Sequence, residues 1–142
     1  MVMGQMLDLN GEHQQLSQTE LEAIHRDKTG ALIEASVSMG AICAKATDSQ
    51  LQALNVFAQN IGLAFQVQDD ILDVTADTKK LGKPAGSDEK LDKSTYVKLL
   101  GVENAKTYAR SLFDTAKNAV IAEFGNDNYL LDLADWLWAR DK

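Results

Sequence analysis

The sequence predicts an all-helical fold, and three observations support this. Its 142 residues include one proline and few runs of β-branched residues, a composition that favours helices over strands. Apolar residues recur with the period of an α-helix, and capping residues separate the periodic segments. With 45% apolar and 25% charged residues, the chain has the size and composition of a single helical domain, residues 1–142.

The first elements follow from these signals in chain order. A first helical segment ends at Asn10–Gly11 and has no capping residue at its start. This start is expected of a chain that was cut from a longer one or that begins at an internal methionine. Ser17 and Glu20 form a capping box for the next helical pattern, which runs to about Ala46 and is open to a break near residues 26–29.

Capping residues and glycines also divide the rest of the chain. Asp48 is expected to cap the longest helix, residues 49–76, and a loop rich in lysine, aspartate and glycine follows it. Three further helices are expected: a short one capped by Ser94 and ended by Gly101, one over residues 103–124 ended by Gly125, and one over residues 128–140.

The longest helix combines apolar faces with one polar seam. At 100° per residue, the residues of this seam fall in a single stripe: Asn55, Gln59, Gly62, Gln66, Asp69 and Asp73. A helix that is apolar on most sides is buried, and buried carboxylates are costly unless they are paired or bound to metal. We therefore expect the seam to line an interior polar cavity in which Asp69, Asp70 and Asp73 hold a cation. Carboxylate oxygens at this spacing suit Mg²⁺, and the alternative is a solvated acidic face.

Two lysines are candidates for binding an anion. Lys83 lies in the loop after the three acids, where it could neutralise a metal-bound anion, and the alternative is an ordinary surface lysine. Lys28–Thr29–Gly30 precedes a strongly apolar helical run, where a lysine, a hydroxyl and exposed N–H groups predict an anion site. The alternative there is a helix start with a solvated lysine. Met39 and Cys43, within the apolar run, are expected in the core.

Several classes of function are excluded or disfavoured. A net charge of −7 argues against a nucleic-acid partner, because the electrostatic footprint of such a protein is basic. The sequence has no phosphate-binding GxxxxGK[ST] loop, no GxGxxG and no nucleophile elbow. No apolar segment is long enough to span a membrane. A single cysteine cannot form an internal disulfide, so a reducing, cytoplasmic location is expected.

Taken together, the motifs resemble the C-terminal half of the short-chain trans-prenyl diphosphate synthases of the farnesyl or geranyl type. The match covers essentially the whole chain. The motifs that support it occur in the family's order: Gly4-Gln5-x-x-Asp8, Ile24-His-Arg-Asp-Lys-Thr-Gly-Ala-Leu-Ile33, Gly62-x-x-Phe65-Gln66-x-x-Asp69-Asp70-Ile-Leu-Asp73, Gly82-Lys83-Pro84 with Gly86-x-Asp88, Lys93–Tyr96, and the basic tail Arg140-Asp-Lys142.

This resemblance implies a fold and a set of roles. The family's fold is the antiparallel isoprenoid-synthase bundle, which implies about six helices here, and its two aspartate motifs hold three Mg²⁺ ions on an allylic diphosphate. Asp69 would bind Mg²⁺ directly, with Asp70 and Asp73 ordering its water shell. The other roles implied are diphosphate binding by Lys28 and Lys83, a lining of the reaction site by Thr29, Phe65 and Gln66, a neighbouring wall with Gln5 and Asp8, and a basic tail with Arg140.

One departure from the family pattern changes the expectation for activity. The family's first aspartate motif and the basic residues that bind isopentenyl diphosphate are missing from this sequence. We therefore expect no significant prenyl transfer by this chain alone. Half a bundle would expose apolar walls, so a symmetric homodimer is also predicted. The alternatives are a non-catalytic helical module descended from such an enzyme and, less favoured, a terpene cyclase.

Overall fold

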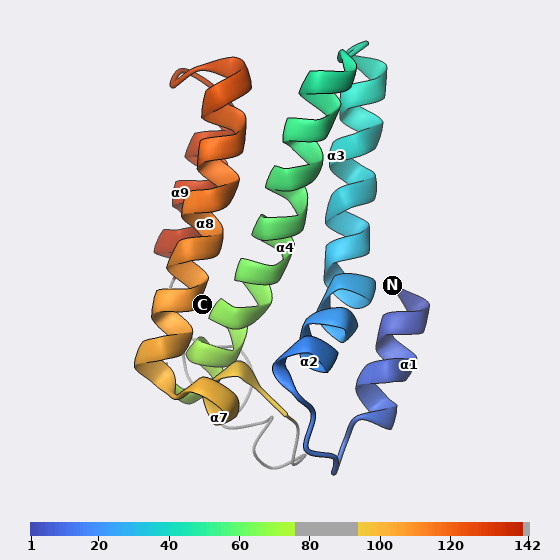
Figure 1. The fold of residues 1–142 in the computed structure, drawn as a ribbon, viewed down its shortest axis with the longest axis vertical. Helices are drawn as coiled ribbons and strands as arrows, with labels where there is room; N and C mark the ends of the chain where they lie inside the picture. The colour runs from blue at the N-terminus through green and yellow to red at the C-terminus, as the bar shows by residue number, and fades with distance from the viewer. Residues whose placement is uncertain (76–93, 141–142) are drawn as a thin grey trace.

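The computed structural model describes residues 1–75 and 94–140, and every regular element in these ranges is a helix. The elements are α1 (Val2–Asn10), α2 (Gln18–His25), η1 (Arg26–Gly30), α3 (Ala31–Cys43), α4 (Asp48–Thr75), α7 (Tyr96–Leu100), α8 (Val102–Phe124) and α9 (Tyr129–Ala139). The all-helical prediction is confirmed. Figure 1 shows α4 in the middle of the bundle, between α3 on one side and α8 on the other.

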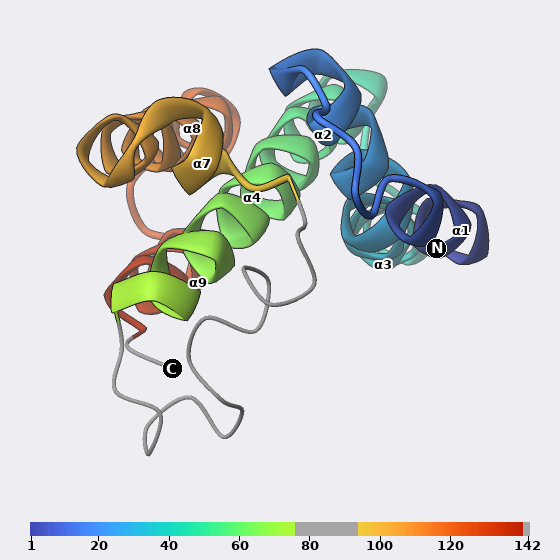
Figure 2. The same ribbon diagram turned by 90° about the horizontal axis from the view of Figure 1, so that it is seen from below.

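The core lies between α4 and the C-terminal helices. Figure 2 shows α7 and α8 on one side of α4 and α1 and α3 on the other, while α2 also reaches α8, because Tyr108 Oη donates to Glu22 Oε1 at 2.6 Å. Large apolar side chains of α4, including Phe57, Ile61 and Val67, are 0–2% exposed and belong to one core cluster with α8. The α8 residues of this cluster include three alanines, which allow close packing of the two helices: Ala105, Ala109, Leu112, Phe113, Ala116 and Val120.

Two of the predicted helix caps are wrong by one residue. The long helix begins at Asp48, and its capping box is formed by Thr47, whose Oγ1 accepts from the Gln50 N–H while Gln50 Oε1 accepts from the Thr47 N–H. Thr95, rather than Ser94, caps α7 by accepting from the Lys98 N–H. Ser94 instead joins the N-terminal half, since its hydroxyl donates to Gln14 O and accepts from the Leu16 N–H. The predicted capping box of Ser17 and Glu20 is confirmed.

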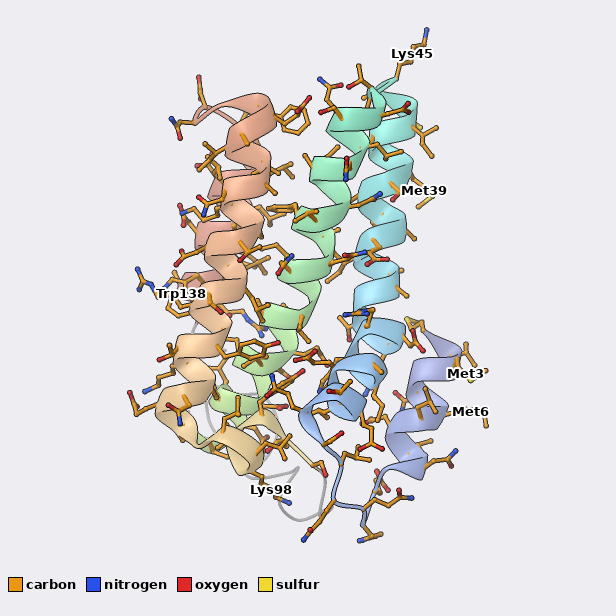
Figure 3. All side chains as sticks on the ribbon, in the orientation of Figure 1. Met3, Met6, Met39, Lys45, Lys98 and Trp138 are labelled. Carbon is orange, nitrogen blue, oxygen red and sulfur yellow. The ribbon has the colours of Figure 1, made fainter. Side chains whose placement is uncertain are left out.

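The face formed by α1 and α3 is apolar and exposed. Met39 is 62% exposed and Cys43 is also exposed, so the expectation that both lie in the core is wrong. Their helix contributes a single buried side chain, because no described element covers its outer face. Figure 3 shows Met3 and Met6 projecting outward from α1 and Met39 projecting from α3. Among the described residues, none of the helices has the length and apolar character needed to traverse a lipid bilayer.

Candidate functional site

The segment Arg26–Gly30 is a π-helix that joins α2 to α3 without a break. The N–H of Ala31 donates to Arg26 O, five residues earlier, and both flanking residues keep right-handed helical dihedrals. The break considered near residues 26–29 is therefore a widened turn. The N–H groups near Lys28 do not belong to a free helix N-terminus, so this part of the predicted anion site is wrong. π-turns inside helices occur frequently at functional sites.

Two glycines allow neighbouring helices to approach the backbone of η1. A Cβ on Gly4 of α1 would lie 2.2 Å from Lys28 N and 2.5 Å from Asp27 C, which no side chain can tolerate. A Cβ on Gly62 of α4 would lie 3.0 Å from the Cα of Gly30. The glycines of two separate sequence motifs thus bring α1 and α4 against the same π-turn, which places the lysine and threonine of that turn beside both helices.

Lys28 lies at the edge of an apolar pocket between α1 and α3. Its Nζ donates to Asp8 Oδ2 at 2.8 Å, and the Asp8 side chain is only 14% exposed. The pocket, of about 410 Å³, is lined by Met1, Val2, Gln5, Met6, Lys28, Thr29 and Leu32. The structure therefore brings together the sequence-predicted residues Gln5, Asp8, Lys28 and Thr29. The ammonium group has three donors, so its ion pair with Asp8 leaves it able to bind an anion.

His25 is the residue at this site that the sequence interpretation passed over. It is 8% exposed, and its ring stacks on Tyr96 with centroids 5.6 Å apart. Burial lowers the pKa of His25 to about 4, an effect that Asp8, Gln66 and Asp69 oppose and Lys28 reinforces. Neither ring nitrogen makes a hydrogen bond of full geometry within the described ranges, and the Gln66 side chain is a polar group beside the ring. Its place three residues before Lys28, within a motif already recognised, was the available signal.

The polar seam of α4 faces α3 and η1. Ser38 Oγ donates to Asn55 Oδ1 at 3.2 Å, and Gln66 lies next to the His25 imidazole. Farther along, the Asp69 side chain is 45% exposed, while Asp73 is 1% exposed. The contacts with α3 and η1 thus involve Asn55, Gly62 and Gln66, whereas Asp69, beyond them along the seam, is half-exposed and Asp73 is buried.

Asp70 points to a different part of the structure. Its Oδ2 accepts a hydrogen bond of 2.8 Å from the N–H of Tyr96, the first residue of α7, and both groups are buried. Asp70 therefore fixes the start of α7 to α4. A structural role of this kind was missed, because the DDxxD spacing says nothing about a backbone donor that lies 26 residues away.

Arg140, the residue after α9, lies next to Phe65 and the Asp69 carboxylate of α4. Its Nη2 donates to Phe65 O at 3.0 Å, and its Cζ lies 3.8 Å from the centroid of the Phe65 ring. The same Nη2 is 3.6 Å from Asp69 Oδ1. Burial lowers the pKa of Arg140, and the charge of Asp69 opposes this shift. The structure thus places Arg140 and Phe65, both predicted site residues, next to the predicted metal ligand.

The carboxylates fit a magnesium ion only in a limited sense. No group of three or more metal-binding side chains occurs within residues 1–75 and 94–140. Mg²⁺ needs only one or two protein carboxylates and keeps several waters, and the half-exposed Asp69 offers such a carboxylate, whereas Asp73, one turn later, is 1% exposed. Lys83 and the motif from Gly82 to Asp88 lie outside the described residues. Chemically, the described residues offer a half-exposed carboxylate, an ammonium group and an apolar pocket.

Comparison with known proteins gives a consistent result. The family model described as polyprenyl synthetase matches residues 1–123. The farnesyl diphosphate synthase of Haemophilus influenzae is 54% identical over 82% of this chain and 40% of its own length. The farnesyl diphosphate synthase of Escherichia coli is 49% identical over 98% of this chain and 48% of its own length. The chain thus spans less than half the length of these relatives.

A solved structure supports the same relationship. The crystal structure of the Helicobacter pylori geranyltransferase, complexed with magnesium and isoprenyl diphosphate, is similar to this chain with a TM-score of 0.79 and 36% identity. The similarity covers 96% of this chain and 45% of that one. The predicted helical bundle is therefore the bundle of isoprenyl synthases.

Proposed function

The chain belongs to the polyprenyl synthetase family, a family of prenyltransferases, and on this premise we propose that it forms the half-site that binds an allylic diphosphate through Mg²⁺. One observation supports the proposal above all others. Gly4 of α1 and Gly62 of α4 both allow their helices to approach the π-turn η1, and Lys28 of that turn pairs with Asp8 of α1 at 2.8 Å, so residues from three elements converge on one place. The apolar pocket at Lys28 and Thr29 borders this place and suits an isoprenoid tail.

The proposed roles follow from the chemistry of allylic diphosphates. Asp69 would hold Mg²⁺, with Asp73 one turn away, and the bound ion would stabilise the negative charge that grows on the leaving diphosphate. Lys28 would donate to diphosphate oxygens with the N–H groups that its pair with Asp8 leaves available. Thr29, Phe65 and Gln66 would line the site beside the reacting carbons, and the apolar pocket would exclude water from the allylic cation.

Attack by isopentenyl diphosphate requires groups that this chain does not contain. The sequence has a single DDxxD motif, Asp69–Asp73, where the family pattern has two. We therefore expect the chain to bind Mg²⁺ and diphosphate but to show no significant prenyl transfer when it is assayed alone with both substrates. Ordinary turnover by the purified chain would contradict this expectation. Binding without turnover is also what the alternative, a non-catalytic diphosphate-binding module, would show.

The direct test is calorimetric titration with Mg²⁺ and inorganic diphosphate. Asp69→Ala and Lys28→Ala should each weaken binding by at least tenfold, because each removes a charged group that contacts the proposed ligand. Asp114→Ala, which removes an exposed carboxylate from α8, is the matched control and should bind as the unmodified chain does. Equal binding by Asp69→Ala and the control would refute the proposed metal site.

A second part of the proposal concerns a homodimer. Several large apolar side chains of α1 and α3 are exposed outside the pocket at Lys28: Met3, Leu7, Leu9, Met39 and Ile42. Exposed apolar surfaces are usually covered by a partner, and a second copy of the chain is the partner we propose. Sedimentation velocity at micromolar concentration should show a dimer, and the variant with Met3→Glu and Met39→Glu should be monomeric. A compact monomer of the unmodified chain would contradict this part.

A further inference from the structure

Arg140 is bound to α4 by three kinds of contact at one place. Its Cζ lies 3.8 Å from the centroid of the Phe65 ring, which makes a cation–π contact, and its Nη2 donates to the Phe65 carbonyl at 3.0 Å. The same nitrogen lies 3.6 Å from Asp69 Oδ1. The backbone is held as well, because Gln68 Nε2 donates to Trp138 O at 2.9 Å. The end of α9 is therefore fixed beside Asp69.

The charges of this pair are unequally solvated. The Arg140 side chain is 12% exposed, whereas the Asp69 side chain is 45% exposed. A cation this deeply buried is costly unless an anion lies near it, and Asp69 is the carboxylate with which Arg140 forms an ion pair within the described residues. Its Nε is buried without a hydrogen-bond partner among these residues, so the stabilisation rests on the Nη2 side of the group.

We propose that Arg140 is a resident counter-cation of Asp69, and that a divalent cation must displace this charge in order to bind there. This inference rests on the proposed function, in which Asp69 binds Mg²⁺. Two cations on one carboxylate repel each other, and the repulsion is stronger near a protein surface than in bulk water. Binding of the metal therefore weakens the contact of Arg140 with Asp69, and the C-terminal end of α9 responds to occupancy of the metal site.

The first test is the affinity for Mg²⁺ alone, measured by calorimetry on the full chain. Arg140→Gln should bind Mg²⁺ about two- to fivefold more tightly, the range expected when a partly exposed ion pair no longer competes. Arg110→Gln is the matched control: Arg110 also lies over an aromatic ring, with its Cζ 5.5 Å from the Trp138 centroid, and its loss removes the same charge. This control should leave the affinity for Mg²⁺ unchanged. Thermal melts of both variants verify that they fold.

The second readout is the fluorescence of Trp138, measured in a Trp136→Phe background. Trp138 packs edge-on against Phe113 with centroids 5.5 Å apart, close to the end of α9, so a change at Arg140 should alter its emission. Mg²⁺ should shift this emission in the parent chain and shift it much less in Arg140→Gln. If Arg140→Gln does not fold, Arg140→Lys, which keeps the charge but not the planar stack, should give an intermediate affinity.

The outcomes separate this inference from the proposed function. Equal or weaker Mg²⁺ binding by Arg140→Gln would overturn the inference alone, and weaker binding would show that Arg140 assists the ligand rather than competing with it. If the unmodified chain binds neither Mg²⁺ nor Mg²⁺ with diphosphate, both the inference and the proposed metal site fail.

Discussion

The two sides of α4 are packed very differently. Toward α8, side chains such as Phe57 and Val67 are at most 1% exposed and belong to a continuous core. On the side of α1 and α3, Met3 and Met39 are more than 60% exposed on the outer faces of these helices, and close approach to η1 depends on Gly4 and Gly62. Most of the candidate site lies on this second side, and Arg140, which follows α9, completes it beside Asp69. The core that stabilises the fold and most of the proposed binding residues thus lie on opposite faces of α4.

The largest expected effect tests the first side. Phe57→Ala should lower the free energy of unfolding by about 3–5 kcal/mol, because it opens a cavity in a core that cannot readily collapse. Met39→Ala, the matched truncation on the exposed side, should change it by less than about 0.5 kcal/mol at a protein concentration low enough to keep the chain monomeric. Urea denaturation followed by circular dichroism measures both. Similar losses for the two variants at that concentration would show that the α3 face is buried within a single copy of the chain.

The next effect tests the second side at its closest contact. Gly4→Ala should destabilise the chain by about 1–3 kcal/mol, since its Cβ would meet the Lys28 backbone at 2.2 Å. It should also weaken binding of Mg²⁺ with diphosphate by about tenfold, because α1 moves away and Lys28 loses its pair with Asp8. The binding loss is measured by calorimetry.

Gly40→Ala is the control for this glycine. A Cβ there meets nothing within 4 Å, so the substitution should stabilise α3 by about 0.5–1 kcal/mol and leave binding unchanged. A Gly4→Ala variant as stable as Gly40→Ala would mean that α1 does not press on the π-turn in solution.

A pH dependence should come from His25, where the two sides meet. The pKa of His25 is lowered from 6.5 to about 4 by burial, so the folded state favours the neutral ring. As the pH falls, His25 is protonated in the unfolded chain before it is protonated in the folded chain. The free energy of unfolding is therefore highest above pH 6.5 and decreases as the pH falls toward 4. At pH 5 the loss should be about 2 kcal/mol.

His25→Phe keeps a ring to stack on Tyr96 but removes the titration, so it should flatten the acid slope of stability. His13→Asn is the control, because His13 is exposed and its φ of 62° suits asparagine. Chemical denaturation at several pH values between 4 and 7 measures the free energy of unfolding of both variants and of the unmodified chain. An unchanged slope in His25→Phe would show that another group controls the acid response.

The sequence predicted the elements better than the contacts between them. Helix periodicity and capping boxes act over a few residues, so α4 and the Ser17–Glu20 cap could be found without a structure. The π-turn could not, because its cause is tertiary: Gly4 and Gly62 admit two helices to one stretch of backbone. The motifs predicted the residues of the site. The ion pair between Lys28 and Asp8 could not be predicted, because it depends on the same close approach of α1 to the π-turn.

The two adjacent aspartates offer the finest distinction between the faces. They are neighbours in one motif, yet Asp70 is buried and accepts from the Tyr96 N–H, whereas Asp69 is half-exposed beside Arg140. Asp70→Asn should cost about 1 kcal/mol of stability, because a charge-assisted hydrogen bond to a buried N–H becomes a neutral one. Asp69→Asn should cost about 0.5–1 kcal/mol, because it leaves the Arg140 charge without this carboxylate, and it should abolish Mg²⁺ binding, which Asp70→Asn should leave intact. Thermal melts and Mg²⁺ calorimetry on both variants measure the pair. If Asp70→Asn alone lost the metal, the direct ligand would be the residue that anchors α7, and the division between a structural and a chemical face of α4 would fail at its most sensitive point.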